Sequence, residues 1–380
     1  MIQFENVSKI YRGQDQPVLS DINMTIPNGK LTVLIGPSGC GKTTCLKMIN
    51  RLVNISSGKI TIDGQDIMSQ DPIELRRTMG YVIQQTGLFP HLTVRENIEI
   101  IPTLQNQEKD KIRRRTLELM EMVGLDPEEF LDRYPTQLSG GQLQRVGVAR
   151  AFATDPEIIL MDEPFSALDP ITRAQLQSEL IFLQSKVQKT IVFVTHDMDE
   201  AIKLGDMICI LHQGHVVQFD TPEAIMKQPA DSYVAKFVGR NRIWNNPEYI
   251  RARDIMIHDP VAVPGGLPIL RTMEIMRAHK VDSALILDEE RHLMGVVRAR
   301  DIQTCEDKNA STETLLQPPK GTASPDENII QLLTKVQENH LSTLPILDGD
   351  GKLEGLITTS SLVTAMSQQY IPAIGEEAQS

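Results

Sequence analysis

The sequence predicts an α/β protein in two parts: a larger N-terminal domain built on a parallel sheet, and a smaller C-terminal module that contains a duplicated α/β unit. Three short apolar runs, at Leu31–Ile35, Ile158–Met161 and Thr190–Thr195, have the composition of buried parallel strands. The last third of the chain also resembles itself at a fixed offset. Because each unit of this repeat holds apolar strands that need a partner, we expect the two copies to pair with each other.

Length and composition restrict the class of protein. A chain of 380 residues is expected to hold two or three domains, and its apolar fraction of 41% is that of a globular protein. The net charge of −12 argues against non-specific binding to nucleic acid or anionic lipid. No apolar run approaches the ~18–20 residues that cross a bilayer, and the first residues lack the layout of a signal peptide. Since the four cysteines form no CxxC pair, we expect a soluble cytoplasmic protein without a disulfide framework.

The first apolar run leads into a phosphate-binding loop. Residues 36–44 read Gly-Pro-Ser-Gly-Cys-Gly-Lys-Thr-Thr, which matches G-x-x-x-x-G-K-[ST], and a helix-forming segment follows. The backbone N–H groups of such a loop, together with the N-terminus of the next helix, cradle a polyphosphate. Lys42 is expected to reach the β- and γ-phosphates, and the Thr43 hydroxyl is expected to ligate Mg²⁺. Cys40 within the loop is either a small filler or a reactive thiolate.

Two acidic residues end the second apolar run. Asp162 follows the predicted core strand, where a carboxylate beside the phosphate loop can hold the Mg²⁺ shell. The adjacent Glu163 is placed to polarise an attacking water. Acids after a strand also commonly begin a surface loop, so the pair by itself leaves both interpretations open.

Between these runs lies Leu138-Ser-Gly-Gly-Gln142, and here the sequence resembles the ATP-binding cassette (ABC) ATPases, whose signature is LSGGQ. The family's other motifs appear in order: Tyr11 for the aromatic residue that stacks on adenine, Gln84 for the Q-loop, Asp169 for the D-loop and His196 for the switch histidine. Gln85 makes the Q-loop register ambiguous, but the Gly-Leu-Phe-Pro-His that follows favours Gln84.

This resemblance implies a fold and a mechanism. The fold is a P-loop NTPase of the ABC cassette type, with a helical subdomain at about 88–138. ATP is expected to contact Tyr11, Gly36, Ser38, Gly39, Cys40, Gly41, Lys42, Thr43 and Thr44. Two cassettes are expected to close as a homodimer on two ATP molecules, each site being completed in trans by Ser139, Gly140, Gly141 and Gln142. Glu163 is implied as the general base, His196 as the γ-phosphate sensor, and Thr43, Gln84 and Asp162 as the Mg²⁺ shell.

The presence of one cassette points to a transporter subunit. Lys42 and Ser139 are 97 positions apart (139 − 42), too few for the coiled-coil arm of repair-type relatives, and translation-type relatives carry two cassettes. The basic run at 108–115 is interpreted as a solvated helix face because acidic residues follow it, so no nucleic-acid partner is expected. By resemblance, the subunit works at the cytoplasmic face of the cell membrane on a separate permease, received at 86–96, with an extracytoplasmic substrate-binding protein.

The C-terminal repeat resembles a tandem pair of CBS domains. Met276–Asp288 aligns with Val336–Asp348 (336 − 276 = 60), and each copy reads as helix, strand, Asp-rich turn, strand and helix. In the second copy, Ser324-Pro-Asp-Glu327 has the form of a capping box at a helix start. The predicted boundaries are 1–240 for the cassette, 241–250 for a polar linker, 251–309 for the first copy, 310–370 for the second and 371–380 for a frayed tail.

Neither copy carries the complete pattern of an adenosine site, which is usually Gly, then Ser or Thr, then Asp. The first copy has Gly295, Arg298 and Asp301, and the second has Gly355, Thr358 and Ser361. By resemblance, the pair senses ionic strength or a cyclic dinucleotide; the alternative is that it only dimerises. A cleft for cyclic di-AMP at the twofold of two CBS pairs is expected to be lined by Val281, Ser283, Ala284, Thr343, Leu356 and Thr358, with Arg298 and Arg300 as a basic alternative.

A cassette followed directly by two CBS domains resembles the ATPase of osmoprotectant importers of the glycine betaine/carnitine/choline class. The resemblance implies hydrolysis of MgATP that drives uptake of a quaternary amine. Two alternatives stay open, the first of them because such an ATPase never touches the cargo. One is an importer of an amino acid or another small solute, and the other is a CBS-based sensor whose ATPase serves no transport.

Overall fold

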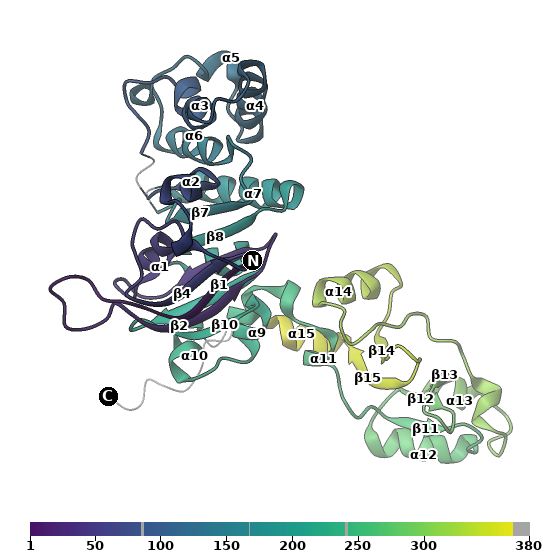
Figure 1. Ribbon diagram of the computed structural model, residues 1–380. Helices are drawn as coiled ribbons and strands as arrows, with labels where there is room; N and C mark the ends of the chain where they lie inside the picture. The colour runs from purple at the N-terminus through teal and green to yellow at the C-terminus, as the bar shows by residue number, and fades with distance from the viewer. Residues whose placement is uncertain (85–86, 167, 240–241, 368–380) are drawn as a thin grey trace, which may run out of the picture. The chain divides into compact units, whose positions relative to one another are not determined.

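The chain divides into two compact units, Met1–Val238 and Gly239–Ser380, which Figure 1 traces. The computed structural model describes residues 1–84, 87–166, 168–239 and 242–367. Gln85 and Thr86, which bear on the Q-loop register and on the predicted permease segment, lie outside the described residues, as does the predicted tail. The division falls two residues before the predicted end of the cassette at 240 (240 − 238).

A six-stranded, mainly parallel sheet forms the centre of the first unit, in the order β10-β9-β3-β8-β7-β6. The three runs predicted as buried strands are β3, β7 and β8, and all of their residues are buried. Ile35 of β3 lies opposite Thr195 of β8, and Asp162 of β7 lies opposite Val194, so the carboxyl ends of these strands meet at one edge. The six strands are β3 (Leu31–Ile35), β6 (Met79–Val82), β7 (Ile158–Asp162), β8 (Thr190–Thr195), β9 (Met207–His212) and β10 (His215–Asp220).

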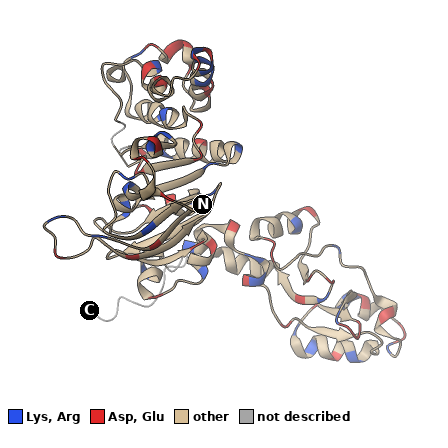
Figure 2. Cartoon of the chain, viewed as in Figure 1, with Lys and Arg blue, Asp and Glu red and all other residues tan. Residues whose placement is uncertain are grey.

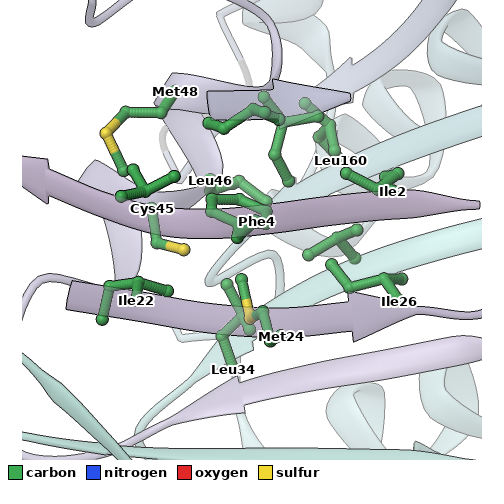
Figure 3. Packing of buried hydrophobic residues seen from close by; sticks show 14 of the residues in the cluster. Ile2, Phe4, Ile22, Met24, Ile26, Leu34, Cys45, Leu46, Met48 and Leu160 are labelled. Carbon is green, nitrogen blue, oxygen red and sulfur yellow. The ribbon is translucent and has the colours of Figure 1, made fainter. Parts of the chain in front are cut away.

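A second, antiparallel sheet packs on the first through helix α1 (Lys42–Ile49). Its order is β2-β1-β4-β5, with β1 (Ile2–Lys9), β2 (Leu19–Ile26), β4 (Ser57–Ile62) and β5 (Gln65–Asp66). Phe4 and Met24 of this sheet share one buried cluster with Leu46 of α1 and with residues of β3, β7 and β8 (Figure 3). Because α1 directly follows the predicted phosphate loop, this packing holds its N-terminus at the edge where β3 ends.

A group of helices extends from the sheet core: α3 (Val94–Leu104), α4 (Lys109–Met122), α5 (Pro127–Phe130) and α6 (Gly140–Phe152). Helix α6 packs against both α3 and α4, so the group continues past the predicted limit of about 138 (Figure 1). Basic and acidic side chains are interleaved around α4 (Figure 2), where Arg115 pairs with Glu118 and Asp155. The other helices of this unit are α2 (Pro72–Arg77), α7 (Pro170–Val187), α8 (Met198–Leu204), α9 (Pro222–Lys227) and α10 (Ser232–Val238).

The second unit contains the predicted repeat. Its two strand hairpins have the same register, with Ser283 opposite Arg298 in one and Thr343 opposite Thr358 in the other. The first copy contains β11 (Ala262–Pro264), α12 (Ile269–His279), β12 (Ser283–Leu287), β13 (Leu293–Arg298) and α13 (Ala299–Thr304). The second copy contains α14 (Ile329–Glu338), β14 (Thr343–Leu347), β15 (Leu353–Thr358) and α15 (Thr359–Ser367).

The structure of each copy includes a segment that the predicted boundaries place in another part of the chain. Ile250 and Ala252, the latter at the start of α11 (Ala252–Ile255), are buried in the core of the second copy, and Ile257 pairs with Leu356. In the other direction, Gln317 pairs with Val296 in the first copy. The predicted boundaries of 251–309 and 310–370 therefore follow the repeat in sequence but not the composition of the two cores.

The predicted polar linker is also packed in its described part. Short 3-10 turns at Arg242–Asn245 and Pro247–Tyr249 lead into α11. Ile243 and Trp244 lie against the core of the second copy, because apolar side chains within a polar segment still gain free energy from burial.

The cap predicted for α14 differs from the observed one. The helix begins at Ile329, and its N-cap is Asn328, whose side chain accepts from the Gln331 backbone N–H. Ser324 and Glu327 instead close a turn just before the helix, in which the Ser324 backbone N–H donates to the Glu327 carboxylate at 2.8 Å. Asn328 and Ser324 are both residue types that commonly cap helices. Ile329, the first residue of the observed helix, is buried, which fits a start at Ile329 with Asn328 as the N-cap.

We predict that Ile250→Ala destabilises the second unit by about 2–4 kcal/mol, because it opens a cavity in the core of the second copy. Leu270→Ala is the matched control, since Leu270 is 43% exposed on α12. Chemical unfolding of the full chain, followed by circular dichroism, measures both variants. Equal small losses for the two would mean that the segment before α11 does not belong to this core.

Candidate functional site

The loop at residues 36–41 has the backbone of a phosphate cradle. A Cβ on Gly36 would lie 2.1 Å from the Leu211 carbonyl oxygen, and a Cβ on Gly41 would lie 2.5 Å from the Leu19 side chain. Lys42 is buried, and its Nζ donates to the carbonyl oxygens of Gly36 and Pro37 at 2.8 and 3.0 Å. The ammonium group is therefore held inside the loop, while Ser38 and Gly39 are exposed at its tip.

Thr43 and Asp162 meet where α1 begins and β7 ends. The Thr43 hydroxyl donates to Asp162 Oδ1 at 2.7 Å, and the Asp162 side chain is almost fully buried. Burial raises the pKa of this carboxyl, and the hydrogen bond from Thr43 opposes part of that rise. A hydroxyl and a carboxylate are the oxygen ligands that Mg²⁺ prefers, so this pair fits a magnesium ion.

Glu163 is the point where three predicted motifs converge. Its backbone has a positive φ of 45° directly after β7, which turns the side chain out of the strand. Its Oε2 accepts from Gln84 Nε2 at 3.3 Å and lies 3.3 Å from His196 Nδ1. The structure thus brings Gln84, Glu163 and His196 together at the same sheet edge as Lys42 and Asp162.

Tyr11 and Cys40 lie close to the loop in different ways. The Tyr11 hydroxyl lies 3.3 Å from Thr44 Oγ1, and Lys9 Nζ lies 5.0 Å from the centre of its exposed ring. A ring in this position is available for stacking beside the phosphate loop. Cys40 is buried, and burial raises the pKa of its thiol, which disfavours the thiolate and favours the filler interpretation.

The signature segment is separate from the phosphate loop of the same chain. Ser139 caps α6, and its backbone N–H and hydroxyl form a reciprocal pair of hydrogen bonds with Gln142. Ser139 and Gly140 are exposed, and among the described residues no hydrogen bond joins this segment to residues 36–44. Asp169 caps α7, where its side chain accepts from the backbone N–H groups of Ile171 and Thr172.

Sequence reasoning missed a buried polar group next to His196. Glu200 is 7% exposed, and its carboxylate accepts from the Thr195 hydroxyl at 2.6 Å. In the sequence, Glu200 stands out only as an acidic residue on the apolar face of a short helix. Hydrophobic periodicity alone does not distinguish such a residue from an acid on the protein surface.

The second unit holds a cavity of about 740 Å³ between its two copies. This cavity lies within one chain, whereas the predicted cleft lies at the twofold of two CBS pairs. Of the residues predicted for that cleft, those that line this cavity are Val281, Ser283, Arg298, Arg300, Thr343, Leu356 and Thr358. Ala284 does not, and this prediction is corrected: it is fully buried in the core of the first copy, because successive side chains on β12 point to opposite faces. Asp301 accepts from Gln317 Nε2 at 3.0 Å, and Thr358 and Ser361 pair through their hydroxyls.

Comparison with known proteins identifies the family. The family model described as ABC transporter matches residues 19–166, and that described as CBS domain matches residues 252–305 and 315–368. The chain is 45% identical to the choline transport ATP-binding protein OpuBA of Bacillus subtilis, over 100% of this chain and 99% of that protein. The chain belongs to the family of ABC transporter ATP-binding proteins.

Other members of the ABC family support the same fold. The glycine betaine/carnitine/choline transport ATP-binding protein OpuCA of Bacillus subtilis is 45% identical over 96% of this chain and 95% of its own. The dimeric structure of MJ0796, a bacterial ABC transporter cassette, is 36% identical with a TM-score of 0.54, over 58% of this chain and 99% of that one. The predicted α/β class, an ABC cassette followed by tandem CBS domains, is confirmed.

The described helices of this ABC subunit include no candidate membrane span. Among the helices at 1–84, 87–166, 168–239 and 242–367, none is both long enough and apolar enough to span a bilayer.

We predict opposite effects from two Asp→Asn substitutions. Since the folded-state pKa of Asp162 is raised, its ionised form costs stability above the ordinary pKa of 3.8, so Asp162→Asn should raise the unfolding temperature measured at pH 7 without nucleotide. Hydrogen bonds from Thr172 and Ile171 lower the pKa of Asp169, so Asp169→Asn should lower that temperature. Both differences should shrink as the pH falls towards 3.

Thermal unfolding of the full chain between pH 7 and pH 3 tests the predictions for both variants. A lower unfolding temperature for Asp162→Asn at pH 7 would contradict the burial argument. Since Asn keeps an acceptor for the Thr43 hydroxyl, a lost hydrogen bond would not explain that result.

Proposed function

We propose that this chain is the ATP-hydrolysing subunit of an importer for quaternary-amine osmoprotectants such as glycine betaine, carnitine and choline. The observation that carries the proposal is similarity over the whole chain, CBS pair included, to ATP-binding proteins named for transport of choline and of glycine betaine/carnitine/choline. The osmoprotectant import ATP-binding protein OsmV of Salmonella typhimurium is also 40% identical, over 97% of this chain and 96% of that protein.

Each of the residues at the sheet edge has a separate proposed role in ATP hydrolysis. The loop N–H groups and Lys42 hold the phosphates, and the Lys42 carbonyl contacts are exchanged for phosphate oxygens when ATP enters. Glu163 takes a proton from the attacking water, and His196 orients the γ-phosphate from the next strand. Thr43, Asp162 and Gln84 would hold Mg²⁺, which supplies charge neutralisation between the phosphates.

A second copy of the chain completes each site. The exposed start of α6 presents its first backbone N–H groups outward, which suits a phosphate of another subunit rather than of its own. Ser139, Gly140, Gly141 and Gln142 would contact that nucleotide, and Asp169 would lie at the shared interface. Bound ATP would then hold the two subunits of a homodimer together, and ATP hydrolysis would allow the subunits to separate. The relative MJ0796 has been solved as a dimer and with ADP and Pi.

We infer that import also involves partner proteins. The subunit would dock on permease subunits at the cytoplasmic face of the cell membrane, through the segment around residues 86–96, and a substrate-binding protein would deliver the amine from outside. Phe89 is an exposed aromatic side chain within this segment, so it is available for such a contact. No nucleic-acid partner is proposed, since the net charge is −12.

The CBS pair is proposed as a regulator that binds an anionic nucleotide, with cyclic di-AMP as the leading candidate. A cavity of about 740 Å³ is large enough for such a ligand. Arg298 and Arg300 supply guanidinium groups for phosphates, and the hydroxyls of Ser283, Thr343 and Thr358 supply hydrogen bonds. Because these side chains can form directed contacts with a nucleotide, they favour nucleotide binding over a response to ionic strength alone.

Uptake by the complex tests the proposed cargo. The chain is reconstituted with its permease and binding protein in vesicles that contain ATP, and entry of labelled choline, glycine betaine, carnitine and an amino acid is compared. We expect uptake of at least one quaternary amine, and none with Glu163→Gln, which should bind ATP, hydrolyse it at least about 100-fold more slowly and accumulate as a closed dimer. Lys42→Ala should not bind ATP and should stay open. Transport of the amino acid alone would reject the proposed cargo.

Calorimetric titration tests the regulatory ligand. The full chain with Lys42→Ala is used so that the cassette does not compete for nucleotide, and cyclic di-AMP, AMP and ATP are each added. We expect saturable binding of cyclic di-AMP that Arg298→Ala weakens about 10-fold or more, as expected for a charge-assisted contact. Absence of binding by all three nucleotides would reject the nucleotide proposal and leave sensing of ionic strength, or dimerisation, as the role of the pair.

A further inference from the structure

The loop that carries His196 is held by a polar network that no proposed catalytic role accounts for. The His196 side chain is 60% exposed, and Glu163 is its described side-chain partner. Its two neighbours in the chain are fixed much more firmly. Thr195, the last residue of β8, is 2% exposed, and Asp197 caps α8 by accepting from the Asp199 and Glu200 backbone N–H groups at 2.8 and 3.4 Å.

The Thr195 hydroxyl joins the two sides of His196. It accepts from the Asp197 backbone N–H at 3.0 Å and donates to Glu200 Oε2 at 2.6 Å. The first of these hydrogen bonds spans His196 and closes the turn that presents it. The second attaches the turn to helix α8, so the backbone on both sides of the histidine is tied to one carboxylate.

The remaining contacts of Glu200 reach a third element. Its Oε1 accepts from Gln177 Nε2 at 3.1 Å, and Gln177 Oε1 accepts from Lys203 Nζ at 3.0 Å. Glu200 and Gln177 are 7% and 6% exposed, so their polar atoms would cost free energy without these partners. Gln177 lies on α7, the helix that begins after Asp169, so the network connects the start of α8, the end of β8 and α7.

We propose that Thr195, Glu200 and Gln177 are positioning residues that hold His196 at the distance from Glu163 that ATP hydrolysis requires. This inference rests on the proposed role of His196. An exposed histidine on an unsupported turn would sample many orientations, and a displacement of about 1 Å at a reacting group can cost about 100-fold in rate. The network removes that freedom without touching ATP, so its loss lowers kcat rather than ATP affinity.

Thr195→Val removes the hydroxyl and keeps the shape of the side chain, and Thr195→Ser is the conservative variant that keeps the hydroxyl. Thr32→Val is the matched control: Thr32 lies in the neighbouring strand β3, opposite Val192, is fully buried, and its hydroxyl has no hydrogen-bond partner among the described residues. We expect Thr195→Val to lower the kcat of the full chain about 10- to 100-fold, with ATP affinity within about threefold of wild type. Thr195→Ser should recover most of kcat, and Thr32→Val should change it less than about twofold.

The double variant with His196→Ala separates this inference from the proposed function. If the network acts through His196, Thr195→Val should cause no further loss of kcat in the His196→Ala background. Equal kcat values for Thr195→Val and Thr32→Val, or a loss that persists without His196, would overturn the positioning role. A His196→Ala variant with wild-type kcat would instead overturn the proposed role of His196. If Thr195→Val does not fold, Gln177→Met applies the same test from α7.

Discussion

The parallel register of β3, β8 and β7 is the constraint on which the nucleotide site depends. Ile35 lies opposite Thr195 and Asp162 lies opposite Val194, so the three strands end within one residue of each other. A different group follows each strand at the same edge: the phosphate loop after β3, His196 after β8, and the acidic pair Asp162 and Glu163 at the end of β7. A slip of one residue in any pairing would reverse the faces of that strand and remove its group from the site.

Around this edge, the charged groups have polar partners within the chain. Lys42 donates to carbonyl oxygens of its own loop, Asp162 accepts from Thr43, and Glu163 contacts Gln84 and His196. None of these groups is left buried and unpaired, which would cost several kcal/mol. A nucleotide that enters the loop would therefore exchange one set of polar contacts for another.

The CBS module shows how a sequence repeat and a packed core can have different limits. The hairpins keep the offset seen in the sequence, yet Ile250 is buried in the second copy and Gln317 pairs with the first. This exchange ties the two copies together through backbone pairing as well as through side chains. It also places the segment that follows the cassette within the core of the second CBS copy.

The sequence by itself determined the motifs whose chemistry is local. The loop at 36–44, the carboxylates at 162–163 and the repeat could be predicted because strand, turn and helix signals lie next to each other in the chain. Only the tertiary structure decided which groups support them. Glu200 meets Thr195 and Gln177 across two helices and a strand, Ala284 faces the core instead of the cavity, and Asn328 rather than Ser324 caps α14. In each case the outcome depends on which face of an element is buried, and burial is set by partners distant in the sequence.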